Sequence, residues 1–340
     1  MNSSAPVVQL VNIGGCHPPD SGSSPDRGAN DRSQASFLDK KCLRNRAKTI
    51  SRRAIRGAMY LALSAGAIGI KASLERQLEL AANNGFKGLY IDVDDAARIG
   101  VRKVSEMFRA KGLIPAAWWL PLDLRGDERS YERSLVKPRE YADISEQLGC
   151  LRTSTYILSF SDTLPWDKNY DFHLKRLRPA AQILAESECL LGLEFLGPRT
   201  LREGHRYEFI HTLQDMLKLC QNIETGNVGL LLDSWHWYTS HGKVDDIEAL
   251  GDGEVVDVHV NDAPKEIPID KQIDNVRRMP GETGVIDIVG FLRALDKIGY
   301  TGPVMAEPFN KELEKMSDSE ASRATAESLR KIWSLANLRH

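Results

Sequence analysis

Leu190-Leu-Gly-Leu-Glu-Phe-Leu196 is an apolar run of strand length, and a helical pattern follows it from about Tyr207 to Gln221. The next strand-length run, Val228-Gly-Leu-Leu-Leu-Asp233, comes directly after that helical pattern. Parallel strands need a long crossover between them, usually a helix, so this strand–helix–strand order predicts an α/β fold with a parallel sheet.

The same alternation extends from this stretch in both directions. The eight predicted strands are Leu61–Ile70, Gly88–Val93, Leu113–Leu120, Leu151–Phe160, Leu190–Leu196, Val228–Asp233, Val255–Asn261 and Gly302–Glu307. Helices are predicted from about Ser73 to Gly85, Asp95 to Lys111, Arg139 to Leu148, Tyr170 to Ser187, Tyr207 to Gln221, Val244 to Leu250, Ile288 to Ile298 and Ser317 to Leu335. Eight such units within about 280 residues predict a (β/α)8 TIM barrel. A doubly wound open sheet is the alternative, but Gly66-Ala-Ile-Gly69 lacks the G-x-G-x-x-G pattern of a dinucleotide-binding turn.

Composition excludes several classes of protein. The chain has 340 residues, with 45 Lys and Arg against 47 Asp and Glu, so its formal net charge is -2. That balance argues against a protein that binds nucleic acid through bulk charge. No apolar run approaches the length of about 18 residues that a membrane helix needs. Five widely spaced cysteines without a CxxC pair indicate reduced thiols, and therefore predict a cytoplasmic protein.

The first 56 residues differ in composition from the rest of the chain. Polar residues and Arg crowd the region from 20 to 33, and a basic cluster follows between Lys40 and Arg56. No periodic apolar pattern there is long enough to bury a face, so residues 1–56 are predicted to be a disordered extension. Residues 57–340 are predicted to form the barrel, a single catalytic domain.

Charged or ionisable side chains interrupt four consecutive apolar strands. Glu194, Asp233 and Glu307 lie at the carboxyl ends of the fifth, sixth and eighth strands, and His259 lies within the seventh. The carboxyl ends of barrel strands converge on the face that holds the active site.

Each of these residues alone has an ordinary structural explanation, as a helix cap or a hydrogen-bonded core histidine. Four in succession require four independent coincidences, and burying three carboxylates with an imidazole is costly unless a cation compensates their charge. This oxygen-rich donor set predicts one divalent ion, Mn²⁺ or Mg²⁺ first, with Zn²⁺ or Co²⁺ as further candidates.

Two flanking residues add substrate-binding chemistry. His236 follows Asp233 by three residues and would reach over the same mouth of the barrel. Arg277 lies in the loop after the seventh strand, where a guanidinium can hold substrate oxygens.

The final third of the chain carries a characteristic series of motifs. These are Leu231-Leu-Asp-Ser-Trp-His236, Val258-His-Val-Asn-Asp262, Arg277-Arg-Met-Pro-Gly-Glu-Thr-Gly-Val-Ile-Asp287 and Gly299-Tyr-Thr-Gly-Pro-Val-Met-Ala-Glu-Pro308. In this order they resemble the sugar phosphate isomerase/epimerase family, the xylose isomerase-like TIM barrels that include ketose 3-epimerases and inosose dehydratases. The stretch Leu193-Glu-Phe-Leu-Gly-Pro198 resembles the inosose dehydratase branch.

The resemblance implies roles for individual residues. It implies that Glu194, Asp233, His259 and Glu307 bind one divalent metal, that Glu194 and Glu307 also transfer protons, and that His236 and Arg277 bind substrate. Two features depart from the ketose epimerases: Thr200 stands where they have a further Glu, and the Pro280–Gly284 loop carries an extra residue.

The predicted function is a metal-dependent isomerase or epimerase that acts on a sugar, sugar phosphate or related hydroxy-carbonyl compound through an enediolate. The alternative is a lyase of the inosose dehydratase type, because both reactions begin with the same proton abstraction. An apurinic endonuclease would need a richer set of His ligands, and a metal-free binding barrel would need the four ligands degraded. The expected partner is a small carbohydrate or cyclitol, without nucleic acid or membrane, and a homo-oligomer stays open.

Overall fold

The computed structural model describes residues 58–251 and 253–338, and the predicted disordered extension at 1–56 lies outside them. The strands are β1 Tyr60–Leu63, β2 Gly88–Leu89, β3 Ile114–Pro115, β4 Trp118–Trp119, β5 Arg152–Ile157, β6 Phe160–Ser161, β7 Leu190–Phe195, β8 Tyr207–Glu208, β9 Val228–Asp233, β10 Val255–Val260 and β11 Pro303–Ala306. The helices are α2 Leu74–Asn83, α3 Val93–Ile99, α4 Val101–Lys111, α5 Glu128–Ser134, α6 Val136–Leu148, α7 Trp166–Glu186, α8 Arg199–Arg202, α9 Leu213–Ile223, α10 Ser234–Thr239, α11 Val244–Glu248, α12 Ile288–Lys297 and α13 Asp318–Leu335, with 3-10 turns η1 Gly66–Ile68, η2 Ile269–Lys271 and η3 Leu313–Lys315.

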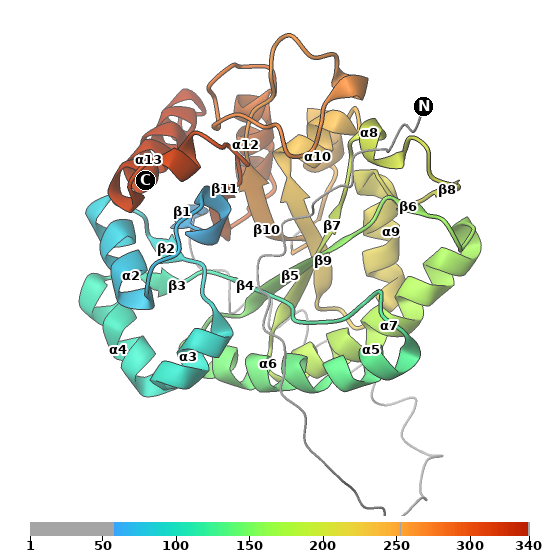
Figure 1. Cartoon of the computed structure of the whole chain (residues 1–340), viewed down its shortest axis with the longest axis horizontal. Helices are drawn as coiled ribbons and strands as arrows, with labels where there is room; N and C mark the ends of the chain where they lie inside the picture. Colours follow the sequence, from blue (N-terminus) through green and yellow to red (C-terminus); the bar gives the residue numbers. More distant parts are fainter. Residues whose placement is uncertain (1–57, 252, 339–340) are drawn as a thin grey trace, which may run out of the picture.

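The main sheet closes on itself as a barrel. Its strands run in the order β3-β2-β1-β11-β10-β9-β7-β5-β4, and every pairing in it is parallel. The two edge strands, β3 and β4, are separated by only two residues of the chain. Together they occupy one strand position of the barrel, and each such position is called a stave below. The nine strands of the described residues therefore make eight staves, surrounded by a ring of helices (Figure 1). The predicted TIM barrel is confirmed.

The second half of the barrel follows the predicted elements closely. The strand β9 spans Val228–Asp233 as predicted, and β7 and β10 end one residue early. Ser317 caps α13, as the sequence indicates, by a capping box in which its side chain and that of Glu320 satisfy each other's backbone N–H groups.

The segment from β1 to α9 differs in detail from the predicted elements. The first predicted strand is only four residues long, because the chain turns into η1 after Leu63. Gly100, with φ of 97°, divides the second predicted helix into α3 and α4. The predicted loop before Pro138 contains the helix α5, which Asp127 caps. The fifth predicted helix begins later, at Leu213, because Tyr207 and Glu208 form β8, antiparallel to β6.

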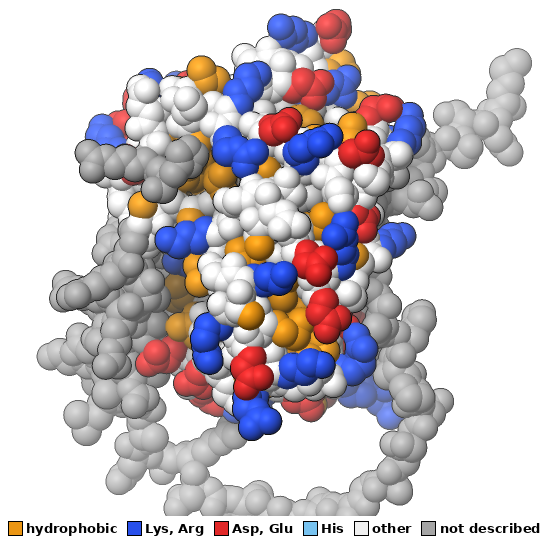
Figure 2. Space-filling view, turned by 90° about the vertical axis from the view of Figure 1, so that its left-hand side faces the viewer, with side chains coloured by type: hydrophobic (Ala, Val, Ile, Leu, Met, Phe, Trp, Pro, Cys, Tyr) orange, Lys and Arg blue, Asp and Glu red, His pale blue; other side chains and the backbone are white. Residues whose placement is uncertain are grey.

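The helices pack their apolar faces on the outward side chains of the strands. Leu191, Leu193 and Phe195 of β7 and Met216 and Leu219 of α9 belong to one buried apolar cluster. On the outer surface that carries α2 and α4, Lys and Arg alternate with Asp and Glu (Figure 2). Among the described residues, no helix combines the length and apolar character needed to cross a bilayer.

Candidate metal centre and active site

Four neighbouring staves bring the predicted metal-ligating side chains together. Glu194 lies in β7, Asp233 ends β9, His259 lies in β10 and Glu307 directly follows β11. One ligand atom from each residue lies within 4.8 Å of the others, and all four side chains are buried. A divalent ion about 2.0–2.2 Å from each donor separates its ligands by up to about 4.4 Å, so this cluster is close to the size that coordination requires.

Strand register explains why these side chains meet. His259 pairs with Asp233 across β10 and β9, so the two residues lie at the same height in the barrel. The backbone N–H of Glu307 donates to the carbonyl of Val260 at 3.1 Å, which extends the pairing of β11 by one residue. Asp233 also caps α10 by accepting the N–H of Trp235 at 2.6 Å.

Several buried ligand atoms in the cluster have no hydrogen-bond partner. Oε1 of Glu194 and both ring nitrogens of His259 are in this state. Nδ1 of His259 lies 3.5 Å from Oε2 of Glu307, and Nε2 lies 3.8 Å from Oδ2 of Asp257. Unpaired buried polar atoms are costly, and a cation at this place would satisfy Oε1 of Glu194 and one ring nitrogen of His259. The residues present therefore fit a divalent metal.

The charge balance of the cluster also favours a divalent metal. Five buried carboxylates, those of Glu194, Asp233, Asp257, Asp274 and Glu307, lie around His259 and the guanidinium of Arg277. If all five are ionised, the charge of Arg277 leaves four negative charges, and a protonated His259 would reduce them to three. Buried charges need compensation, which a divalent cation bound here would supply.

The pKa values of the two glutamates are pushed in opposite directions. Burial raises the pKa of Glu194 well above its ordinary range, and the nearby negative charge of Glu307 adds to this effect. Burial also acts on Glu307, but the positive charge of a protonated His259, whose Nδ1 lies 3.5 Å from Oε2 of Glu307, and the charge of Arg277 outweigh it and lower its pKa. Without a metal, the two carboxyl groups therefore differ in their affinity for a proton.

Arg277 lies deeper than the sequence indicates. Its Nη1 donates to Oδ2 of Asp233 at 2.9 Å and to Oε2 of Glu307 at 3.1 Å, and its side chain is only 1% exposed. Its Nη2 donates to Oδ1 of Asp274 at 3.0 Å. The guanidinium is thus held between two candidate metal ligands and Asp274, and its predicted contact with substrate stays a prediction.

His236 is placed beside Glu194 as a neutral donor. Burial lowers its pKa to about 4, so the ring is uncharged near neutral pH. The N–H of Gly197 donates to Nδ1 at 3.2 Å, which puts the ring proton on Nε2, 3.7 Å from Oε1 of Glu194. Nη2 of Arg277, which donates to Asp274, also lies 3.3 Å from Nε2 of His236. A Cβ on Gly197 would lie 2.1 Å from the carbonyl oxygen of His236, so only glycine permits this approach.

Aromatic side chains from the first strands of the barrel pack against His259. The rings of Trp119 and Tyr90 meet its ring edge to face, with centroids 5.9 and 6.2 Å away. The adjacent Trp118 points the other way, packs on Tyr141 and is buried. Trp119 is therefore the member of the pair that belongs to the site.

Two acidic residues of the site were missed from the sequence. Asp257 accepts hydrogen bonds from the hydroxyl groups of Tyr90 and Ser154 and faces Nε2 of His259. It lies two residues before His259, so strand alternation could have placed it on the same inward face. Asp274 lies in the irregular loop after β10, and no periodic signal marks it.

The residue after Glu307-Pro308 adopts an unusual backbone. Phe309 has φ of 38°, in the left-handed region that bulky residues avoid, and the guanidinium carbon of Arg277 lies 4.4 Å from the centre of its ring. Backbone strain of this kind is found at functional sites. Thr200, where ketose epimerases have Glu, donates to the carbonyl of Gln272 at 2.7 Å.

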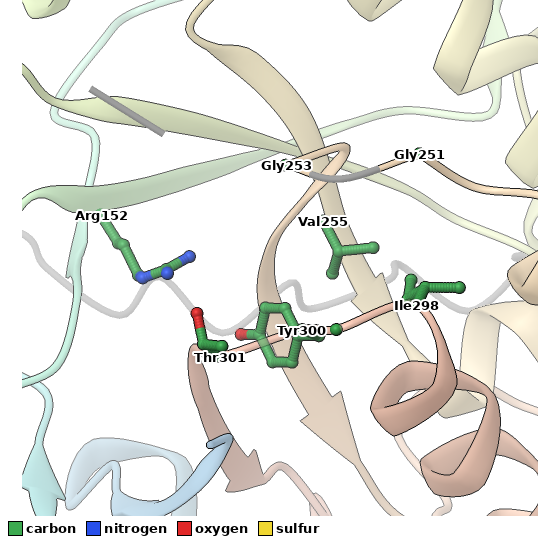
Figure 3. Close-up of a pocket in the computed structure, with 8 residues that line it drawn as sticks. Arg152, Gly251, Gly253, Val255, Ile298, Tyr300 and Thr301 are labelled. Carbon is green, nitrogen blue, oxygen red and sulfur yellow. The ribbon is translucent and has the colours of Figure 1, made fainter. Parts of the chain in front are cut away.

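A second hollow lies at the opposite end of the barrel. Arg152 and Val255, which begin β5 and β10, line it with Tyr300 and Thr301 (Figure 3). The Arg152 side chain is directed toward Tyr300 and donates to the carbonyl of Val256 at 2.5 Å. Active sites of TIM barrels lie at the carboxyl ends of the strands, so this hollow is not the place of the chemistry.

The model of the xylose isomerase-like TIM barrel family matches residues 78–332. The chain belongs to this family. The match includes all four candidate metal ligands, together with His236 and Arg277.

Curated relatives in the family carry out different reactions. Inosose isomerase of Bacillus velezensis is 22% identical over 271 residues, which cover 77% of this chain and 93% of that protein. Inosose isomerase of Bacillus subtilis is 28% identical over 131 residues, 38% of this chain and 44% of that enzyme. 3-Dehydroshikimate dehydratase of Pseudomonas putida is 25% identical over 255 residues, 73% of this chain but only 38% of that protein.

Solved structures share the fold. A xylose isomerase domain protein from Alicyclobacillus acidocaldarius superimposes with a TM-score of 0.75 at 31% identity, over 82% of this chain and all of that one. The IolI protein, solved with a bound zinc atom, superimposes with a TM-score of 0.70 at 20% identity, over 82% of this chain and 99% of that one.

Proposed function

We propose that this chain is a divalent-metal-dependent enzyme that isomerises or epimerises a sugar, sugar phosphate or related hydroxy-carbonyl compound by proton transfer through an enediolate. The observation that carries the proposal is the pair Glu194 and Glu307. They flank one buried cluster, from staves at its two ends, and their pKa values are shifted in opposite directions.

Each residue of the cluster has a defined part in this reaction. One of Glu194 and Glu307 removes the proton beside the carbonyl, and the other returns it. Without the metal, the pKa of Glu307 is lowered and that of Glu194 is raised, so the two carboxyl groups differ in their affinity for a proton. Nε2–H of His236 donates to a substrate oxygen, and Arg277 holds the carboxylates of Asp233 and Glu307 in place.

Glu194, Asp233, His259 and Glu307 would hold the metal. Once bound, the ion supplies Lewis-acid stabilisation of the negative charge that develops on the carbonyl oxygen. Three carboxylates and one imidazole favour Mn²⁺ or Mg²⁺, and the zinc of the IolI structure keeps Zn²⁺ as a candidate beside Co²⁺.

A lyase is the second candidate, because the chain matches 3-dehydroshikimate dehydratases over 73% of its length. Dehydration of an inosose or a related cyclic ketone would begin with the same proton abstraction. The isomerase relatives support the first candidate, since one of them aligns over 93% of its own length.

Incubation in heavy water tests the proposal. The manganese-loaded full chain is given ketoses, ketose phosphates, inososes and 3-dehydroshikimate, and products are read by mass and absorbance. Proton transfer predicts deuterium at the carbon beside the carbonyl. Retention of the substrate's water indicates an isomerase or epimerase, whereas loss of one water indicates the lyase. Absence of exchange across the panel would contradict the proposal.

A further inference from the structure

The side chain of Tyr156 faces the inside of the barrel mouth. Ser154, two residues earlier on β5, donates to Asp257 of β10 across the barrel interior at 3.3 Å. Side chains alternate along a strand, so Tyr156 points to the same side. Its partner in the pairing of β5 with β7 is Glu194, which places the two residues at the same height and about 4.8 Å apart along the sheet.

A guanidinium lies over this tyrosine. Nη2 of Arg125 donates to the hydroxyl group of Tyr156 at 2.9 Å, and its guanidinium carbon lies 4.8 Å from the ring centre. Across residues 58–251 and 253–338, no carboxylate forms an ion pair with Arg125. The three acidic residues nearest to it in the chain bond elsewhere: Asp123 to the N–H of Gly126, Asp127 to the N–H of Ser130, and Glu128 to Lys175 and Arg176.

The backbone that presents Arg125 is held rigidly. Arg176 of α7 is buried and donates through Nη1 to the carbonyls of Leu124 at 2.8 Å and Gly126 at 2.6 Å, on both sides of Arg125. A Cβ on Gly126 would lie 2.1 Å from Oδ2 of Asp123, so a side chain there would displace the carboxylate that accepts the Gly126 N–H. A buried arginine thus fixes the turn that places a second, unpaired arginine at the barrel mouth.

We propose that Arg125, with the hydroxyl group of Tyr156, binds a carboxylate carried by the substrate. This assignment rests on the proposed function, because it places the carboxylate over the stave beside Glu194. A guanidinium recognises a planar carboxylate with two parallel hydrogen bonds, and an unpaired one at a preformed position loses little entropy on binding.

Charge favours a carboxylate over a phosphate. A single unpaired guanidinium supplies one positive charge, which matches a carboxylate, whereas a phosphate monoester carries about 1.5 to 2 negative charges at pH 7. The compounds named for the curated relatives differ in charge. 3-Dehydroshikimate carries a carboxylate, whereas an inosose is an uncharged polyhydroxy ketone.

Calorimetric binding to the manganese-loaded full chain tests the proposal. The probes are 3-dehydroshikimate, scyllo-inosose and fructose 6-phosphate, and the variants are Arg125→Gln, Arg125→Lys and Arg129→Gln. Arg129 is exposed on α5 four residues away and serves as the matched control. We expect wild type and Arg129→Gln to bind 3-dehydroshikimate at least 10-fold more tightly than the inosose. Arg125→Gln should weaken the binding of 3-dehydroshikimate alone, by about 10- to 100-fold. The affinity of Arg125→Lys for this ligand should lie between those of wild type and Arg125→Gln.

Three results would overturn the assignment: equal or no binding of 3-dehydroshikimate and the inosose by wild type, equal weakening of both by Arg125→Gln, or tighter binding of the phosphate ester that depends on Arg125. Heavy-water exchange on the same samples judges the proposed function separately. A carboxylate preference that depends on Arg125 but comes without exchange would contradict the reaction and leave the binding assignment standing.

Discussion

The two halves of the barrel contribute different chemistry to one mouth. The half from β7 to β11 supplies the four candidate metal ligands with His236, Asp274 and Arg277. The half from β1 to β5 supplies Tyr90, Trp119 and Tyr156, with Arg125 as its one charged side chain in these contacts. The second half is built to hold charge, and the first half is built to hold the remainder of a substrate.

Strand length follows this division in part. The described strands β7, β9 and β10 have six residues each and β2, β3 and β4 have two each, but β5 in the first half has six and β11 in the second half has four. Long pairing fixes the heights of Glu194, Asp233 and His259, which lie in the six-residue strands. Changes in the second half should therefore affect metal binding and turnover, and changes in the first half should affect substrate binding.

The largest effect is expected from Glu307→Gln. This change removes a proton acceptor and a metal ligand together, so the rate of heavy-water exchange should fall about 10³-fold or more. Glu312→Gln, an exposed position five residues later, is the control and should keep the wild-type rate. An exchange rate in Glu307→Gln within 10-fold of wild type would contradict the claim that turnover depends on the second half of the barrel.

Asp257→Asn should weaken metal binding by about 10- to 100-fold, because Asp257 faces the ring nitrogen of His259 that points away from Glu307. Titration with Mn²⁺, followed by electron paramagnetic resonance, measures this effect. Asp171→Asn, exposed on α7, is the control. Unchanged affinity in Asp257→Asn would show that Asp257 does not orient His259.

Trp119→Ala should raise KM by about 10-fold while Mn²⁺ affinity stays within about twofold of wild type, since the ring lines the site without offering a ligand atom. Steady-state kinetics and the same Mn²⁺ titration separate the two effects. Loss of metal in this variant would mean that the first half also shapes the metal site.

The last prediction concerns stability rather than catalysis, at His173 of α7, outside the mouth. Burial lowers the pKa of His173 to about 4, below its ordinary value of 6.5. At pH values between these two, the unfolded chain therefore binds more protons at this residue than the folded chain does. The contribution of His173 to the free energy of unfolding is complete above pH 6.5 and falls as the pH drops, by about 2 kcal/mol at pH 5. Urea unfolding at pH 7.5 and 5 should show a smaller loss in His173→Phe than in wild type. Equal losses would contradict this origin.

The sequence predicted the barrel and the meeting of Glu194, Asp233, His259 and Glu307, because long apolar strands with polar ends carry a strong periodic signal. It missed Asp257 although alternation with His259 was present, since a second acidic residue in a buried strand also suits a structural role. Asp274 carried no signal, because it lies in an irregular loop whose path depends on tertiary contacts.

The short elements of the fold were predicted least well. The helix α5 lay in a predicted loop because its apolar face is limited to Tyr131, which is buried, and its start depends on the Asp127 cap. The strand β8 was placed in a helix because two residues carry no periodic signal, and its pairing with β6 is a long-range contact. Arg125 likewise depends on Arg176, about 50 residues away in the chain.

The central claim is that the second half of the barrel binds one divalent metal through Glu194, Asp233, His259 and Glu307. Elemental analysis of wild type, Glu307→Gln and Glu312→Gln, each purified without chelator and dialysed against Mn²⁺, tests it most directly. The account predicts about one equivalent of metal in wild type and Glu312→Gln, and less than about one tenth in Glu307→Gln. Equal metal content in all three proteins would contradict it.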